Sequence, residues 1–280
     1  MAVVVVCVVL VLAGVAAVAS WGGLTVEPPA AAGAVGLPVG LVVRRYLWYL
    51  TVAVTSGVGA GILAAGAGGR LVMRLLAVTA GAGAQGQITE ADEIVGRITS
   101  HGTLGFIVFT GLFFGLASAL AYLLLHRVLP AGRVGGLVYG ALLLVVAGTR
   151  LEPLRASNPD FDLVGPGWLA VVAFSALVLV HGMLVAALAG RIGRVVPLLD
   201  RRPGAIAAHA PLLLLVPAVP VIAVLAAVGV LVVAVTQIPQ AVAAWHTGRL
   251  VTAGRVTLVA AGLVAAPGFV AAVADIVGRG

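Results

Sequence analysis

The densest group of ionisable side chains in this sequence lies between residues 150 and 162. Arg150, Glu152, Arg155, Asp160 and Asp162 fall within thirteen positions, although the chain of 280 residues carries only 16 Arg and nine acidic residues. In an extended segment, alternate residues point the same way, so the two aspartates would face together. With Glu152 they offer the oxygen ligands that a divalent cation prefers, which makes a metal or substrate site one hypothesis.

Ion pairing is the competing explanation for the same carboxylates. Arg70 and Arg74 stand one helical turn apart in an earlier polar connection, and a guanidinium can bind two carboxylate oxygens at once. We therefore expect an ion-paired polar cap in which Arg70 or Arg74 lies near Asp160, Asp162 or Glu152. Solvated charges without fixed partners are the third alternative.

A single histidine, His181, stands in the apolar run VLVHGMLV. Ionisable groups inside membrane-spanning helices usually face a bundle interior or a cavity, so His181 is a candidate functional residue. The alternative is a neutral histidine that is hydrogen-bonded to a neighbouring helix.

Other familiar chemistry is missing from the sequence, which contains no G-x-S-x-G, P-loop, H-E-x-x-H or C-x-x-C motif. The chain has no lysine to form a Schiff base with retinal, and its one cysteine, Cys7, excludes an intrachain disulfide. No clustered basic face indicates nucleic-acid binding. We expect no catalytic residues and no cofactor, and an enzyme is not favoured.

The composition determines which elements must hold these side chains. Hydrophobic residues make up 62% of the chain and charged residues 9%, and the mean hydropathy is +1.22. Apolar runs of about 18 residues or more are typical of helices that cross a lipid bilayer. The sequence therefore predicts an all-α, polytopic transmembrane helix bundle whose constant partner is lipid.

Seven apolar segments are predicted spans: residues 2–20, 46–67, 102–125, 134–149, 167–189, 211–236 and 256–276. The fourth has only 16 residues and needs its flanking arginines to reach the interface. As an alternative, residues 1–20 form an N-terminal appendage, residues 21–43 a Gly/Pro/Ala linker, and residues 44–280 a six-span core.

The connection after the second span is expected to be helical. Arg70 and Arg74 beside an apolar face suggest that the helix continues out of the membrane or lies in the interface. Thr89 to Asp92 resembles a capping box, and Glu93 and Arg97 are spaced as a helical ion pair, so a second short helix is predicted there.

Arginine counts predict the orientation. Nine arginines fall on one side of a seven-span chain and seven on the other, and the larger set is expected in the cytoplasm. This places the N-terminus and the polar cap outside and the C-terminus in the cytoplasm.

Glycine pairs four residues apart favour close helix packing. They are Gly57/Gly61, Gly111/Gly115 and Gly136/Gly140, which support a compact bundle among the second, third and fourth spans. Gly-rich faces are also a means of forming a homo-oligomer or of binding a membrane partner.

Four segments resemble those of uncharacterised multi-span membrane proteins from high-GC Gram-positive bacteria. They are RRYLWYL from Arg44, GGRLVMR from Gly68, Thr89–Thr99 and NPDF from Asn158. The resemblance covers roughly residues 44–200 and implies a bacterial inner-membrane location but no activity. Two functional hypotheses follow: a small-solute transporter or channel, or a structural or partner-binding membrane subunit. An internal cavity lined by His181 would favour the first.

Overall fold

The computed structural model describes residues 2–20, 26–28, 37–217, 219–238 and 248–279, and these form a bundle of helices without β-strands. Its helices are α1 (Ala2–Ala19), α2 (Val39–Ala60), α3 (Gly69–Thr79), α4 (Ser100–Phe106), α5 (Leu112–Leu125), α6 (Gly132–Leu142), α7 (Asp160–Leu163), α8 (Gly167–Val195), α9 (Pro203–Ala208), α10 (Val219–Thr236) and α12 (Gly248–Gly278). The π-helical segments η1 (Gly61–Gly68), η3 (Ile107–Gly111) and η4 (Leu143–Ala147) continue α2, α4 and α6, and η2 (Ala82–Ala84) and η5 (Ala210–Leu215) are 3₁₀ helices.

Five helices of the described chain have the length and apolar character to cross a membrane. They are Ala2–Ala19, Val39–Thr79, Ser100–Leu125, Gly167–Val195 and Gly248–Gly278. Two of the seven predicted spans correspond to shorter apolar helices, Gly132–Ala147 and Pro220–Thr236. The helical, membrane-type fold is therefore confirmed, whereas the count of seven crossings is not.

Helix α2 begins seven residues before the predicted second span. Pro38 precedes its first residue, Val39, and proline is well suited to this place because it has no N–H to lose at a helix start. The last residues of the predicted linker are therefore helical. Most of the linker, residues 21–25 and 29–36, lies outside the described residues.

Two glycine pairs allow α2–η1 and η3–α5 to approach closely. A Cβ on Gly61 would lie 1.9 Å from the carbonyl oxygen of Gly111, and one on Gly115 would lie 2.1 Å from that of Gly57. The predicted close packing of the second and third spans is thus confirmed. Gly140 instead meets Gly182 of α8, so all three predicted glycine faces are in contact within the chain.

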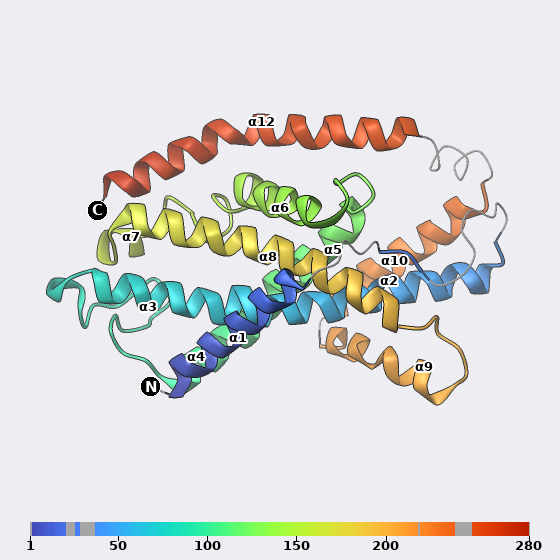
Figure 1. The fold of residues 1–280 in the computed structure, drawn as a ribbon, viewed down its shortest axis with the longest axis horizontal. Helices are drawn as coiled ribbons and strands as arrows, with labels where there is room; N and C mark the ends of the chain where they lie inside the picture. The colour runs from blue at the N-terminus through green and yellow to red at the C-terminus, as the bar shows by residue number, and fades with distance from the viewer. Residues whose placement is uncertain (1, 21–25, 29–36, 218, 239–247, 280) are drawn as a thin grey trace.

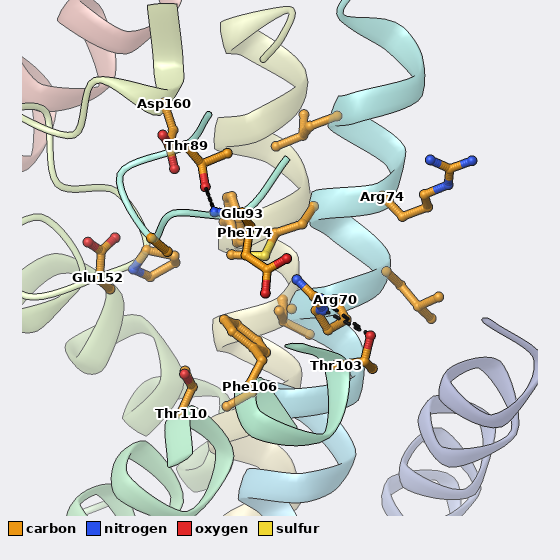
Figure 2. Close-up of a pocket in the computed structure, with 18 of the residues that line it drawn as sticks. Arg70, Arg74, Thr89, Glu93, Thr103, Phe106, Thr110, Glu152, Asp160 and Phe174 are labelled. Atoms are coloured by element: carbon orange, nitrogen blue, oxygen red, sulfur yellow. Dashed lines mark hydrogen bonds between the residues drawn. The ribbon is translucent and has the colours of Figure 1, made fainter. Parts of the chain in front are cut away.

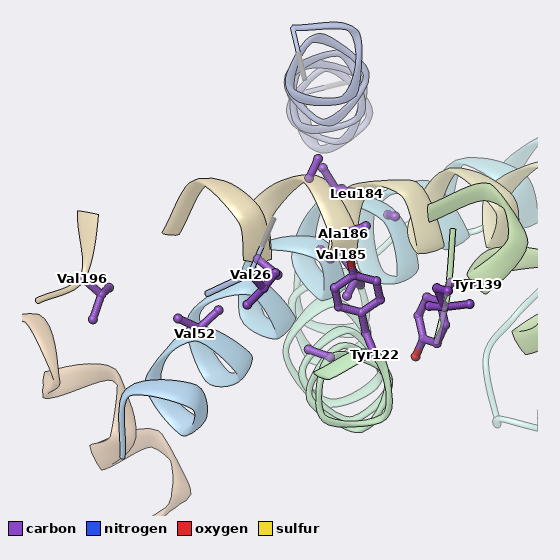
Figure 3. Packing of buried hydrophobic residues seen from close by; sticks show 14 of the residues in the cluster. Val26, Val52, Tyr122, Tyr139, Leu184, Val185, Ala186 and Val196 are labelled. Carbon is purple, nitrogen blue, oxygen red and sulfur yellow. The ribbon is translucent and has the colours of Figure 1, made fainter. Parts of the chain in front are cut away.

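The main core lies where α8 crosses α2, α5 and α6. Trp48 and Leu184 are fully buried, and Tyr122 and Tyr139 have ring centroids 5.3 Å apart. Figure 3 shows these tyrosines beside the α8 residues of the cluster. The indole nitrogen of Trp48 donates to the carbonyl of Val196, 2.9 Å away, which ties α2 to the end of α8.

Helix α1 packs on the bundle through a narrow face. Cys7 is buried against Ala67 and Ile107, and a Cβ on Gly14 would contact Leu63 and Leu184 at 3.5 and 3.4 Å. The rest of α1 is largely exposed, as expected of a helix in contact with lipid.

The predicted sixth span is divided in two. Pro217 and Pro220 remove backbone donors, and the structure has η5 and a turn before α10 begins. Helix α10 lies beside the first half of α2, because the Tyr46 hydroxyl donates to Leu225 O at 2.5 Å and the Gln237 amide to Leu37 O at 3.5 Å. The C-terminal end of α10 therefore lies at the beginning of α2.

This arrangement changes the path of the last helix. Near its start, Arg255 donates to Val128 O at 3.1 Å. At its other end, Arg279 lies 3.7 Å from Asp162, and Ile276 is fully buried against the cluster that holds Phe161. The predicted topology put Asp162 and Arg279 on opposite sides of the membrane, and the structure contradicts that separation. In Figure 1 α1 begins, and α12 ends, at the end of the molecule where α7 lies.

The predicted helix at residues 89–97 is wrong. Thr89 Oγ1 does accept from the Glu93 amide at 3.2 Å, but the segment forms turns and an isolated antiparallel bridge between Ile88 and Ile94. Positive φ angles at Asp92 and Gly96 interrupt helical geometry, and so short a segment gains little from helix formation by itself. The predicted continuation through Arg70 and Arg74 is confirmed by α3.

Candidate functional site

Two polar connections, residues 80–99 and 148–166, dock on one another at one end of the bundle. Asp160 accepts a hydrogen bond from the Glu90 backbone amide at 2.7 Å. Arg155 forms an ion pair with Glu90 and a second one, at 3.1 Å, with Glu152. We call these four side chains the polar cap; its cation is Arg155 and not Arg70 or Arg74 as predicted.

Local geometry explains how Asp160 reaches this position. The Asn158 side chain accepts from the Asp160 amide at 2.8 Å, a turn that Asn-Pro favours, and α7 follows directly. Phe161 is buried against Leu154 and Phe174. The segment is thus a helical turn and not the extended strand that would point Asp160 and Asp162 together. Asp162 turns away to Arg279.

The predicted pairing of Arg70 or Arg74 with these carboxylates is wrong. Arg70 donates to Thr103 Oγ1 at 3.3 and 3.4 Å and lies over the Phe106 ring, 5.6 Å from its centroid. Arg74 donates to the Gly96 carbonyl at 3.3 Å. Arg150, in the turn after η4, donates to Val146 O at 3.4 Å. The ion pair between the two connections is formed by Glu90 and Arg155 instead. Glu90 was predicted only as part of a capping box.

The cation-site hypothesis gains no support from the geometry. Within the described part of the chain, no group of three or more His, Cys, Asp and Glu side chains is placed to hold a metal ion. The carboxylates are held by Arg155 and by backbone donors instead.

Electrostatics in the polar cap are dominated by partial burial. Burial raises the pKa of Glu152 above its ordinary value, although the hydrogen bond from Arg155 opposes this. The charges of Glu90 and Asp160 raise it further. Hydrogen bonds to Glu90 and Glu152 raise the pKa of Arg155. Glu152 is therefore easier to protonate than an ordinary glutamate.

His181 lies deep in the bundle, with a hydrogen-bond partner on another helix. Its Nε2 is 2.7 Å from Ser118 Oγ of α5, and His181 is 7% exposed. Ser118 Oγ also lies 3.0 Å from Gly115 O, to which it can donate. Nε2–H donates to Ser118 in one tautomer of His181, and Nε2 accepts from Ser118 in the other. The Tyr139 hydroxyl donates to the Ser118 carbonyl. A mid-span serine on a different helix was the partner that the sequence analysis missed.

One cavity of about 970 Å³ joins the polar cap to this histidine. Its walls include Glu90, Glu152 and Asp160 at the polar cap, and His181 with Ser118 at the other end. We call this cavity the chamber. Figure 2 shows Arg70 and Phe106 beside it, with Thr110 further from the polar cap and Glu93 and Thr89 nearer to it. Thus the structure brings Arg70, Arg74, Glu152, Asp160 and His181 to one chamber, whereas Arg150, Arg155 and Asp162 do not line it.

Comparisons of this chain with protein-family models, curated protein sequences and solved structures found no match.

Proposed function

We propose that this protein is a multi-pass protein of the bacterial plasma membrane that admits a small solute into the chamber as the first step of transport. The cavity that runs from the polar cap to His181 carries this proposal. Binding sites of transporters lie near the bilayer midplane and are reached from one face at a time. The resemblance noted in the sequence supports the location.

The chamber ends at a contact between two helices that could act as a gate. The Ser118–His181 hydrogen bond joins α5 to α8, and Gly140 lets α6 approach α8 on its other side. A small shift of α8 against α5 would break that contact and open the chamber towards the opposite face. In this view His181 is a gating residue.

The orientation that we propose follows from the path of α12. With α12 crossing towards the polar cap, ten arginines lie at the end opposite to it: Arg44, Arg45, Arg127, Arg133, Arg191, Arg194, Arg201, Arg202, Arg249 and Arg255. Six remain on the side of the cap: Arg70, Arg74, Arg97, Arg150, Arg155 and Arg279. Cytoplasmic connections carry the excess of basic residues, so we place the polar cap and both termini outside. Six helices then cross the membrane, and α10 remains on the cytoplasmic half.

Thiol labelling tests the chamber. In a Cys7→Ala background, Thr110→Cys and Ser118→Cys each place one thiol on the chamber wall, whereas Phe113→Cys places one on the exposed outer face of α5 as the control. A membrane-impermeant thiol reagent applied from outside is expected to label the first two and not the control, since a thiol reacts as the hydrated thiolate.

Labelling from both sides separates transport from simple binding. For a transporter, Ser118→Cys is labelled in right-side-out cells and also in inside-out vesicles, and labelling from either side competes with the other. Labelling from the outside alone would refute transport and leave a binding chamber. No labelling of Thr110→Cys from either side would refute an aqueous chamber altogether.

A further inference from the structure

Arg70 is an arginine inside a membrane-type helix. It belongs to the continuous helix Val39–Thr79, at the start of α3 and one turn further from the polar cap than Arg74. A charged group at such a depth is costly unless it is paired or faces a functional cavity. Arg70 lines the chamber and is only partly exposed.

The partners of Arg70 are neutral. They are the Thr103 hydroxyl, with hydrogen bonds of 3.3 and 3.4 Å, and the face of Phe106. Across the part of the chain that the structure describes, no carboxylate lies within ion-pair distance of Arg70. Nε and Nη2 of Arg70 donate to Thr103. The other edge of the guanidinium, formed by Nη1 and the second N–H of Nη2, can bind a carboxylate or phosphate through two hydrogen bonds.

The carboxylates of the chamber are engaged elsewhere. Glu90 and Glu152 pair with Arg155, and Asp160 accepts from the Glu90 amide. Glu93 lies against the first turn of α4, where a Cβ on Gly102 would come within 2.2 Å of its Oε1. Figure 2 shows Arg70 on the side of Phe106 and Thr110, with Glu93 between it and the polar cap. Glu93 is not within ion-pair distance of Arg70.

The rest of the chamber is suited to an apolar chain. Its wall carries Phe106, Phe109, Phe114, Phe174 and Leu177. Val3, Val4 and Cys7 of α1 also line it, and Phe109 is 78% exposed. The chamber therefore adjoins surface that faces lipid, next to a helix that packs on the bundle through only one narrow face.

We propose that the chamber takes an anionic amphiphile from the bilayer, with its carboxylate or phosphate head group on Arg70 and its alkyl chain among the phenylalanines. This deepens the proposed function by naming a class of solute, and it rests on the same chamber. The head group accepts two hydrogen bonds from the edge of the Arg70 guanidinium that faces away from Thr103, because no protein carboxylate pairs with Arg70. The chain replaces lipid contacts with side-chain contacts of similar polarity.

The test measures ligand-induced stabilisation of the full-length protein in nanodiscs. The probes are decanoate and decyl phosphate, decyltrimethylammonium as the chain-matched cation, and acetate as the anion without a chain. Ligands that bind only the folded state raise its melting temperature. We expect decanoate and decyl phosphate to raise it, and the other two to have no effect at equal concentration.

Variants locate the head group. Arg70→Gln is expected to weaken decanoate binding by roughly tenfold or more, since a charge-assisted hydrogen bond is lost, whereas Arg150→Gln, an arginine on the same side that does not line the chamber, is expected to bind as the parent does. If Arg70→Gln fails to fold, Thr110→Phe serves in its place: it keeps Arg70, fills the chamber and is expected to abolish decanoate binding.

Each other outcome is decisive. Equal stabilisation by decyltrimethylammonium, or unchanged decanoate binding in Arg70→Gln, would overturn the role of Arg70. Equal stabilisation by acetate would overturn the amphiphile and leave a soluble anion. If Thr110→Cys is labelled from outside while decanoate does not bind, this inference fails and the proposed chamber stands. Arg70-dependent decanoate binding without such labelling would contradict only the aqueous chamber.

Discussion

At the scale of single residues, Arg155 connects the two outer segments. It pairs with Glu90 of one segment and with Glu152 of its own, and the side chains of all three are partly exposed. Exposed ion pairs contribute about 0–1 kcal/mol each, and more only when they form a network. The stability of the polar cap therefore depends on Arg155 more than on either carboxylate alone.

Charge exchange tests this pairing. Arg155→Glu places a third acidic group beside Glu90 and Glu152, and we expect a lower melting temperature because an ion-pair network becomes a repulsive cluster. The additional change Glu90→Arg is expected to restore part of the lost thermal stability. The control pair is Arg70→Asp with Asp160→Arg, which should show no recovery because those residues do not pair in the structure. If the melting temperature recovered only in the control pair, the result would support the pairing of Arg70 with Asp160 that was predicted from the sequence.

Glu152 predicts a dependence of stability on pH. Its pKa is raised in the folded protein above the ordinary value of 4.5, so the folded state binds the proton more tightly than the unfolded state does. The contribution to stability is then fully present below pH 4.5 and is lost as the pH rises through the folded pKa. We expect the parent to lose stability relative to Glu152→Gln as the pH rises over that range, in melting curves recorded at matched ionic strength. A relative gain by the parent with rising pH would show that the pairing with Arg155 outweighs burial.

At the scale of helices, close packing depends on glycine. At Gly57, Gly61, Gly111 and Gly115 the backbones of α2–η1 and η3–α5 approach so closely that a Cβ would overlap a carbonyl group. The π-helical segments η1 and η3 lie at this contact, where a change in helical pitch alters which residues face one another. The contact holds Arg70 and Thr103 on adjoining helices at a fixed separation.

A single methyl group is expected to disturb this contact. In Gly61→Ala the new Cβ would lie 1.9 Å from Gly111 O, which is backbone and has little freedom to move. Overpacking of this kind costs about 1–3 kcal/mol or more. The control is Gly268→Ala in α12, where a Cβ meets nothing within 4 Å; this change should leave the melting temperature unchanged or raise it. Equal effects of the two substitutions would contradict the close packing.

At the scale of the whole molecule, the orientation that we propose depends on α10, which does not cross the membrane in that proposal. Since α10 returns along the first half of α2, α12 starts at the end that carries most of the arginines and finishes at the polar cap. Its last turn is fixed there by the burial of Ile276 and by the Arg279–Asp162 ion pair.

Reporter fusions test this arrangement. A fluorescent protein that matures only in the cytoplasm, fused after Gly280, is expected to be dark, and alkaline phosphatase, which is active only outside, is expected to be active at the same place. A matched pair of fusions within residues 191–202 should show the opposite pattern. A bright C-terminal fusion with full-length expression would show that α12 crosses in the other direction.

The sequence by itself determined the helical membrane fold, because apolar periodicity and segment length are local properties. It also determined the glycine contact of the second and third spans, since small residues between apolar helices have few alternatives. It predicted a helix at Thr89–Arg97, where positive φ at Asp92 and Gly96 gives turns instead.

Only the tertiary structure decided which charges meet. Arg155 pairs with Glu90 and Arg279 with Asp162, whereas Arg70 pairs with none of the described carboxylates. Pairing depends on the rotation of each helix and on the docking of two loops, and no local sequence pattern encodes either of these. The chamber between Asp160 and His181 is likewise a product of five or more segments far apart in the chain. The path of α12 has the same origin: arginine counts assume that every apolar run crosses the membrane, whereas the end of α12 beside Asp162 follows from the packing of the last helices.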